Sequence, residues 1–296
     1  SLPESNELLR KWHPAVVLSV GGYAAGPVSA LCRLRGIPLA LLEPNAVMGL
    51  SNRLVAPFVQ RAYTAFDEAE RHCAVRKVLR SGVPIRQGFA PSIWRDEHRP
   101  RRVLVLGGSQ GARTLNESVP LALSSLSVPV AVRHQCGVND IDRVRESYAN
   151  AGMRDAVVES FIDDVPAALR DVDLVISRSG ASAVSEICAV GRASLLVPYP
   201  FAAGNHQERN AVALARAGAA RWVANRDVSS DRLCKEVECL FGDSARLEQM
   251  ANLSRSLGRP NAATVIAKDL LKLAGWSEQL SDLGLSKEKH RCFADA

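Results

Sequence analysis

Short apolar runs alternate with helical patterns along most of the 296-residue chain. The alternation is typical of βαβ units, in which helices join parallel strands and cover both faces of the sheet. The sequence therefore predicts an α/β protein. We expect strands at 16–20, 38–42, 61–66, 103–106, 129–134, 156–161, 173–177, 193–199 and 220–224, and helices at 26–35, 113–123, 140–151, 181–190 and 207–217.

A polar, proline-containing stretch at residues 92–102 interrupts this pattern, and a new strand, glycine turn and helix follow it. Such a break predicts a linker, and the chain length suits about two domains. We place a first domain at 1–98, a second at 99–275 and a polar tail at 276–296. The first domain has about four expected strands, which is few for a doubly wound sheet, so we expect it to be incomplete.

Composition excludes several classes of protein. Hydrophobic residues make up 47 % and charged residues 23 %, which argues against disorder, and no apolar run has the ~18–20 residues of a membrane span. Residues 1–14 lack the apolar core of a signal peptide. Seven scattered cysteines without a C-x-x-C pair argue against a zinc site or a disulfide framework, and suit a reducing cytosol.

The charge of +6 suits anionic lipid or a phosphorylated substrate. Nucleic acid is not an expected partner, because the arginines are dispersed and aromatic residues make up only 5 % of the chain.

Two glycine-rich turns, at residues 19–27 and 105–113, each follow a predicted strand and open a predicted helix. Glycines at such a turn let backbone N–H groups approach an anion, and the helix N-terminus adds partial positive charge. Neither turn has the G-x-G-x-x-G or P-loop pattern, which disfavours a dehydrogenase. Taken alone, each turn is equally compatible with a tight strand–helix connection.

A third turn, at residues 177–186, is rich in serine and ends in Glu186. Its N–H groups and hydroxyls suit a diphosphate, and Glu186 could accept both hydroxyls of a ribose; the alternative is simple helix capping. Polar tips at 43–45 and 205–210 suit sugar hydroxyls, with N-capping as the alternative. We interpret His134 as a structural hydrogen-bonding residue rather than a base. The residues thus predict binding of a nucleotide diphosphate between two domains.

Taken together, these segments resemble one family. The motifs are Gly21-Gly22-Tyr23 with Gly26-Pro27, Glu43-Pro44-Asn45, the GGSQGAR run at 107–113, and the segments 161–164, 177–186 and 206–211. They occur in the order and spacing of the MurG family, the peptidoglycan N-acetylglucosaminyltransferases, and the resemblance runs from about residue 10 to 274.

The resemblance implies a GT-B fold with two Rossmann-like domains and a cleft between them. It implies inverting transfer of N-acetylglucosamine from UDP-GlcNAc to the C4 hydroxyl of lipid I, which gives lipid II, with no required cofactor. A divalent cation is compatible with this reaction, but the sequence does not indicate one and we expect no metal site. In this family Ile162 would lie against uracil, Glu186 against the ribose, Ser109 against the diphosphate and Gln207 against the sugar. The full implied donor set is Asn45, Arg86, Ser109, Ile162, Ala181, Ser182, Ala183, Val184, Ser185, Glu186 and Gln207, and the implied acceptor set is Gly21, Gly22, Tyr23 and Gly26.

The resemblance also implies a peripheral position on the cytoplasmic face of the bacterial inner membrane, with anionic lipids as partners and cell-wall synthesis and division proteins as candidate partners. The family's N-terminal GGTGGH-type loop, which carries a candidate base, does not occur in residues 1–296. We therefore read the sequence as N-terminally shortened, leave the catalytic base unassigned, and expect weak donor binding and little transfer by these residues alone. The alternative is a UDP-sugar-binding remnant or partner of cell-wall assembly proteins.

Overall fold

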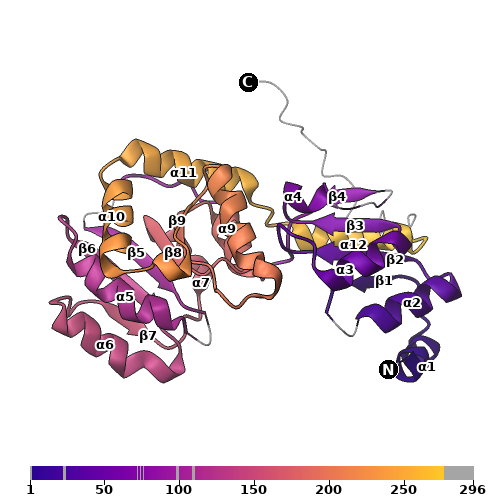
Figure 1. Cartoon of the computed structure of the whole chain (residues 1–296). Coiled ribbons are helices and arrows are strands. Elements are labelled where there is room, and N and C mark those ends of the chain that lie inside the picture. The colour runs from indigo at the N-terminus through magenta and orange to yellow at the C-terminus, as the bar shows by residue number, and fades with distance from the viewer. Residues whose placement is uncertain are drawn as a thin grey trace.

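The computed structural model describes residues 2–22, 25–71, 73, 75, 77–97, 100–108 and 111–276. Two lobes lie side by side, and each is built on a parallel sheet with helices against it (Figure 1). Within these ranges no helix is long and apolar enough to cross a membrane. The predicted tail at 276–296 falls outside the described residues except for Trp276.

The first lobe contains a four-stranded sheet in the order β1-β2-β3-β4, and the second contains a six-stranded sheet. The elements of the first lobe are α1 (Leu2–Trp12), β1 (Val17–Ser19), α2 (Ala25–Arg35), β2 (Leu39–Glu43), α3 (Leu50–Val55), η1 (Ala56–Phe58), β3 (Arg61–Thr64), α4 (Asp67–Glu70) and β4 (Val78–Arg80).

The central strand β2 is buried along its whole length, as expected for a strand covered on both faces. Strand β4 was not predicted, because its three residues are too few to form a recognisable pattern.

The second sheet has the order β10-β9-β8-β5-β6-β7, and all its strands are parallel. Its elements are β5 (Arg101–Leu106), α5 (Arg113–Ser124), β6 (Val130–Gln135), η2 (Val138–Asp140), α6 (Ile141–Asn150), β7 (Val157–Glu159), α7 (Val165–Arg170), β8 (Leu174–Ser177), α8 (Ala181–Val190), β9 (Ala193–Leu196), η3 (Ala203–Asn205), α9 (His206–Arg216), β10 (Arg221–Trp222), η4 (Asn225–Asp227), α10 (Ser230–Phe241), α11 (Ser244–Leu257) and α12 (Ala262–Leu273).

Strands β5 and β8 are neighbours in the second sheet, although two strands separate them in the chain. The strand order therefore reverses between them, as it does in dinucleotide-binding folds. At such a reversal, the loops after the two strands diverge and leave a crevice at the carboxyl edge of the sheet. The six predicted strands of this lobe are all present. The crevice lies where the glycine turn at 105–113 and the serine turn at 177–186 begin.

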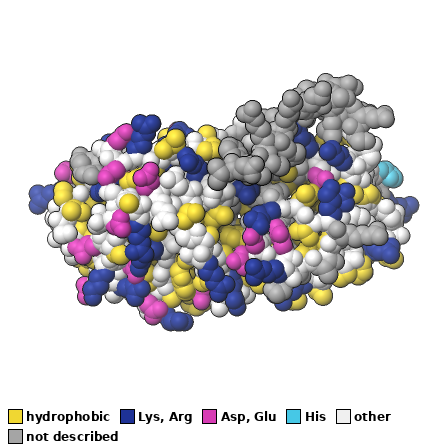
Figure 2. Space-filling view, turned by 90° about the horizontal axis from the view of Figure 1, so that it is seen from above, with side chains coloured by type: hydrophobic (Ala, Val, Ile, Leu, Met, Phe, Trp, Pro, Cys, Tyr) yellow, Lys and Arg dark blue, Asp and Glu magenta, His cyan; other side chains and the backbone are white. Residues whose placement is uncertain are grey.

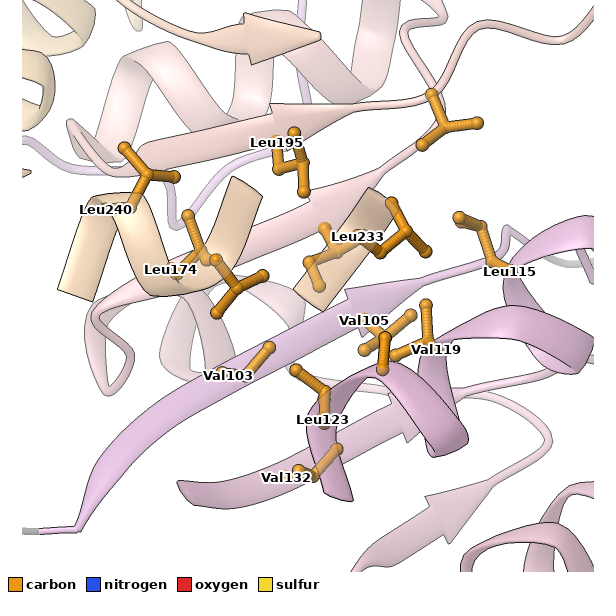
Figure 3. Close-up of a cluster of buried hydrophobic side chains, with 14 of the residues drawn as sticks. Val103, Val105, Leu115, Val119, Leu123, Val132, Leu174, Leu195, Leu233 and Leu240 are labelled. Carbon is orange, nitrogen blue, oxygen red and sulfur yellow. The ribbon is translucent and has the colours of Figure 1, made fainter. Parts of the chain in front are cut away.

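One face of the second sheet packs against α5 and α10 through branched aliphatic side chains. Val103 and Val105 of β5 meet Leu115 and Val119 of α5 in a cluster that is almost entirely shielded from solvent (Figure 3). Burial of such side chains contributes about 1.5–3 kcal/mol each, so the strand ends at the crevice are held by a rigid core.

Helix α12 leaves the second lobe and packs on the first sheet (Figure 1). Ile266 contacts the apolar face formed by β2 and β3, and Asp269 accepts hydrogen bonds from Arg61 Nε at 3.2 Å and from the Tyr63 hydroxyl at 2.9 Å. The domain limits 1–98 and 99–275 stay a prediction. Helix α12 falls within the second range but covers the sheet of the first lobe. The amphipathic pattern of a helix identifies its apolar face but not which sheet the helix covers.

Loss of the Asp269 carboxylate should weaken the packing of α12 on the first sheet. Asp269→Ala leaves the buried Tyr63 hydroxyl without its acceptor, so we expect the free energy of unfolding to fall by about 1–3 kcal/mol. Urea unfolding measures the change, with Lys272→Ala, an exposed residue of the same helix, as control. Tyr63→Phe in the Asp269→Ala background should restore part of the loss; no restoration would show that the hydroxyl is not the cause.

Candidate functional site

A cleft of about 700 Å³ lies between the two lobes at the carboxyl ends of their strands. Both lobes contribute to it, and several of its residues belong to the predicted donor set. Its lining residues are Val20, Leu42, Pro44, Asn45, Val83, Pro84, Gly180, Ala181, Ser182, Ala183 and His206. The cleft therefore brings together the polar tip after β2, the start of α8 and the start of α9.

The N-terminus of α8 faces this cleft. Its N-cap residue, Gly180, has an extended backbone and no side chain with which to cap the helix. The hydroxyl of Ser179 instead donates to the backbone oxygen of Gln207 at 2.8 Å, so it does not cap α8 either. Ala181, Ser182 and Ala183 line the cleft, and the helix N-terminus there suits an anionic ligand such as a diphosphate.

Glu186 lies one turn further along α8, where its side chain is mostly buried. Its Oε1 is 3.7 Å from Nη2 of Arg86, which comes from the segment after β4. Burial raises the pKa of the Glu186 carboxyl, and the Arg86 guanidinium opposes that rise. Arg86 lies beside Phe89, which packs in the core of the second lobe, so the pair lies at the edge of that lobe, one turn beyond the residues of α8 that line the cleft.

Gln207 is held beside the start of α8 by contacts at both of its carbonyl groups. Its side-chain Oε1 accepts from the backbone N–H of Tyr199 at 3.0 Å, and its backbone oxygen accepts from Ser179. Arg178 supports the same loop by donating to the carbonyls of Val197 and Pro198. The amide of Gln207 is therefore fixed in orientation before any ligand arrives.

Asn210, the next inward-facing residue of α9, connects the two lobes through hydrogen bonds. Its Nδ2 donates to the Ser179 carbonyl at 3.1 Å and to the Asn45 Oδ1 at 3.1 Å. Its Oδ1 accepts from the backbone N–H of Ala46 at 2.8 Å. Asn210 is completely buried, so this residue of the polar tip at 205–210 holds the lobes together and is not exposed to sugar hydroxyls as expected.

The first lobe organises its part of the cleft around Glu43. This buried carboxylate accepts from the backbone N–H groups of Asn45 at 3.1 Å and Gly49 at 2.9 Å, and from Asn52 Nδ2 at 2.9 Å. Asn52 also lies against Gly21, which like Gly22 has φ of +86°. Only glycine adopts this backbone readily, so the turn after β1 depends on these two residues.

Six residues of the predicted donor set are not among those that line the cleft, namely Arg86, Ile162, Val184, Ser185, Glu186 and Gln207. The side chain of Ile162 is completely buried among the core residues below β5, so any contact with a base would use its backbone. Val184 packs in the core between α8 and α9, and both Val184 and Ser185 line a second cavity described below. Gly26 lies in the first turn of α2. Ser109 and Tyr23 lie outside the described residues.

His134 belongs to a polar network inside the second lobe. Its Nδ1 is 3.0 Å from the Tyr148 hydroxyl, and its Nε2 is 3.1 Å from Oδ1 of Asn116, whose Nδ2 donates to the carbonyl of Cys136 at 2.9 Å. Burial lowers the pKa of His134 to about 3, so the ring is neutral near pH 7. This structural role agrees with the interpretation from sequence. In the part of the chain that the structure describes, no cluster of His, Cys, Asp and Glu could hold a metal ion.

Comparison with known proteins agrees with this arrangement. Residues 102–270 match the glycosyltransferase family 28 C-terminal domain, and residues 1–64 match the N-terminal domain of the same family. A relative from Sorangium cellulosum, named UDP-N-acetylglucosamine--N-acetylmuramyl-(pentapeptide) pyrophosphoryl-undecaprenol N-acetylglucosamine transferase, is 47 % identical over 92 % of this chain and 68 % of its own length. A relative of the same name from Anaeromyxobacter sp. strain Fw109-5 is 43 % identical over 90 % of this chain and 71 % of its own length.

Solved structures show the same fold. The crystal structure of Acinetobacter baumannii MurG has a TM-score of 0.80 at 32 % identity and covers 92 % of this chain and 78 % of its own. A Neisseria meningitidis UDP-GlcNAc 2-epimerase has a TM-score of 0.63 at 14 % identity over 92 % of this chain and 80 % of its own, which shows the fold alone.

Two parallel-sheet domains with a cleft at their strand ends define a GT-B glycosyltransferase, as the family resemblance implied. Within that class, the chain belongs to the MurG family of glycosyltransferase family 28.

The buried neutral His134 makes a pH-dependent contribution to stability. Its pKa is lower in the folded protein than the ~6.5 of an unfolded chain, so between these values the unfolded state binds more protons. Its contribution is therefore complete above about pH 6.5 and falls by roughly 1.4 kcal/mol per pH unit below it. Urea unfolding at pH 7 and pH 5.5 should show a smaller decrease for His134→Gln than for the unaltered protein. The exposed residue His13 supplies the control, and an equal effect of His13→Gln would contradict this assignment.

Proposed function

We propose that this protein transfers N-acetylglucosamine from UDP-N-acetylglucosamine to the C4 hydroxyl of lipid I, with inversion, to form lipid II. The observation that carries the proposal is the start of α8 at the cleft, with Glu186 one turn beyond it and Gln207 beside it. The 47 % identity to a curated transferase supports the same reaction. We propose the limits 1–98 and 99–275 as the two domains, with α12 returning to the first.

Each part of the donor has a matching group in the second lobe. The diphosphate lies at the N-terminus of α8, where backbone N–H groups stabilise the charge that develops on departing UDP. The carboxylate of Glu186 accepts hydrogen bonds from the ribose hydroxyls, and Arg86 opposite it limits the cost of burying that charge. The amide of Gln207 contacts the hydroxyls of the transferred sugar.

The first lobe supplies the acceptor side. The turn of Gly21, Gly22, Tyr23 and Gly26 contacts the diphosphate of lipid I, and Asn45 contacts the donor sugar from across the cleft. The reacting sugar passes through an oxocarbenium-like state, as in glycoside cleavage, so the two lobes must hold the hydroxyl and the anomeric carbon in close alignment. The hydrogen bonds of Asn210 support that alignment, because they join Asn45 and Ala46 to the loop before α8.

We further propose a peripheral position on the cytoplasmic face of the bacterial inner membrane. Exposed apolar side chains occur on α1, α2 and α3 and on η1, and basic residues accompany them. An apolar surface bordered by basic residues suits the interface of an anionic bilayer, where each basic residue contributes about 1 kcal/mol. The apolar residues are Leu8, Trp12, Leu34, Leu50, Leu54 and Phe58, and the basic ones are Arg10, Lys11, Arg33, Arg35 and Arg53.

The reaction is tested with the protein expressed from its full coding sequence, given radiolabelled UDP-GlcNAc and lipid I. We expect labelled lipid II, and none when lipid I is omitted. Glu186→Ala should weaken UDP-GlcNAc binding about tenfold, as expected for hydrogen bonds to a charged group. The control ligand is 2′,3′-dideoxy-UDP, which lacks the ribose hydroxyls that Glu186 is proposed to bind. Glu186→Ala should leave the binding of this ligand unchanged. Donor binding without any transfer would favour a UDP-sugar-binding protein over an enzyme.

Binding to vesicles tests the membrane position. Vesicles that contain anionic lipid should retain the protein at low salt and release most of it at 0.5 M NaCl, because salt screens the attraction of basic residues. The double substitution Leu8→Ser and Trp12→Ser should weaken retention further, while Val138→Ser, an exposed apolar residue of the second lobe, should not. Binding that is equal for neutral and anionic vesicles would contradict the proposal.

A further inference from the structure

A second cavity, of about 350 Å³, also lies between the two lobes; it meets the cleft at Val83 and is otherwise lined by different residues. Helix α8 stands between the two spaces: Ala181, Ser182 and Ala183 line the cleft, whereas Val184, Ser185 and Cys188 line the second cavity. We call this space the back cavity. Its remaining lining comes from the segment around α4, from the residues after β4, from α9 and from the end of α11.

The inner wall of the back cavity is apolar. Val184 and Cys188 of α8 and Leu214 of α9 are all buried, and Phe66 and Leu257 pack against the same cluster. Burial raises the pKa of the Cys188 thiol to about 11, so this group also remains uncharged at neutral pH. The inner wall therefore suits a hydrocarbon ligand. Because water occupies about 30 Å³ per molecule in the liquid, the cavity holds on the order of ten groups of that size.

The rim of the back cavity is charged and predominantly basic. Figure 2 shows basic and acidic side chains beside apolar ones where the two lobes meet. The charged lining residues are Arg71, Arg80, Arg216 and Arg259 against Asp67 and Glu68, a net charge of +2 from four cations and two anions.

These four arginines differ in their partners. Arg80 forms ion pairs with Asp67 and Glu70, and Arg259 donates to two backbone carbonyls. Arg71 and Arg216 have no side-chain hydrogen bond or ion pair within the described residues. They come from different lobes, the first from the end of α4 and the second from α9.

We propose that the back cavity binds an amphipathic anion, a molecule with one aliphatic chain and a single carboxylate or phosphate group. The chain lies against α8 and α9, and the anionic group lies at the rim with Arg71 and Arg216. Neither part of the cavity suits a neutral polar ligand, since the inner wall offers few hydrogen-bonding groups and the rim carries excess positive charge. Such a ligand contacts both lobes and the helix that begins at the donor cleft, so its binding stabilises the arrangement of the lobes seen here.

Titration calorimetry with decanoate and decyl phosphate, below their micelle concentrations, tests the proposal. We expect saturable binding of at least one of the two anions, and at least tenfold weaker binding of 1-decanol, which has the same chain without the charge. The anion that binds more tightly identifies the headgroup. Binding should persist in saturating UDP, because the donor cleft lies on the other side of α8; displacement by UDP would place the ligand in the cleft and overturn the proposal.

Two variants locate the ligand. Arg216→Ala should weaken binding of the anions about tenfold, whereas Arg209→Ala, which removes the same charge from an exposed position of the same helix, should not. Ala217→Leu, at an exposed position of the lining, should fill part of the cavity and weaken binding without unfolding the protein, as checked by circular dichroism. Equal effects of Arg209→Ala and Arg216→Ala, or unchanged binding by Ala217→Leu, would overturn the assignment.

Discussion

The amide of Asn210 is the interaction on which the geometry of the site depends. One buried side chain donates to Ser179 and Asn45 and accepts from Ala46, so it ties the loop before α8 to the polar tip after β2. A buried polar group without its partner costs about 1–3 kcal/mol, and each of these partners relies on the same side chain. The relative position of the two lobes at the cleft is thus set by hydrogen bonds with fixed directions, in addition to apolar packing. Apolar packing alone would allow small sliding movements, and transfer between two bound substrates tolerates little misalignment.

Helix α8 combines three tasks because of where it lies in the sheet order. It follows β8, the strand at which the order reverses, so its N-terminus projects into the crevice rather than against a neighbouring loop. Its buried side, with Ile187 and Val190, anchors it in the core below β5, which keeps that N-terminus in place. Its remaining sides lie between the cleft and the back cavity. Binding of a ligand on one side of α8 can therefore affect the other side, because the helix moves as a rigid body about three turns long.

Much of this fold could be predicted from sequence because parallel strands buried on both faces leave a strong signal. All six strands of the second sheet were expected from their branched aliphatic runs, and the serine turn at 177–186 was expected to meet a nucleotide. Strand β4 was missed, because three residues are too few for a pattern. The packing of α12 on the first sheet was also missed, because the apolar face of a helix does not identify the sheet that it covers. Ile162 shows a different limit: the motif predicts a ligand contact for this residue, but the structure shows that its side chain belongs to the core.

Residues whose role depends on several distant partners left the weakest signal. The three partners of Asn210 lie 31 to 165 residues away in the chain, so no local spacing could reveal them, whereas the donors around Glu43 lie within nine residues of it. The same holds for the back cavity, whose lining combines α4, α8, α9 and the end of α11. Each of its arginines looks like an ordinary surface residue in the sequence. Only the docking of the lobes, which Asn210 fixes on the cleft side of α8, brings Arg71 and Arg216 to the rim of one cavity on the other side. The hydrogen bonds that align the proposed substrates therefore also create the second space.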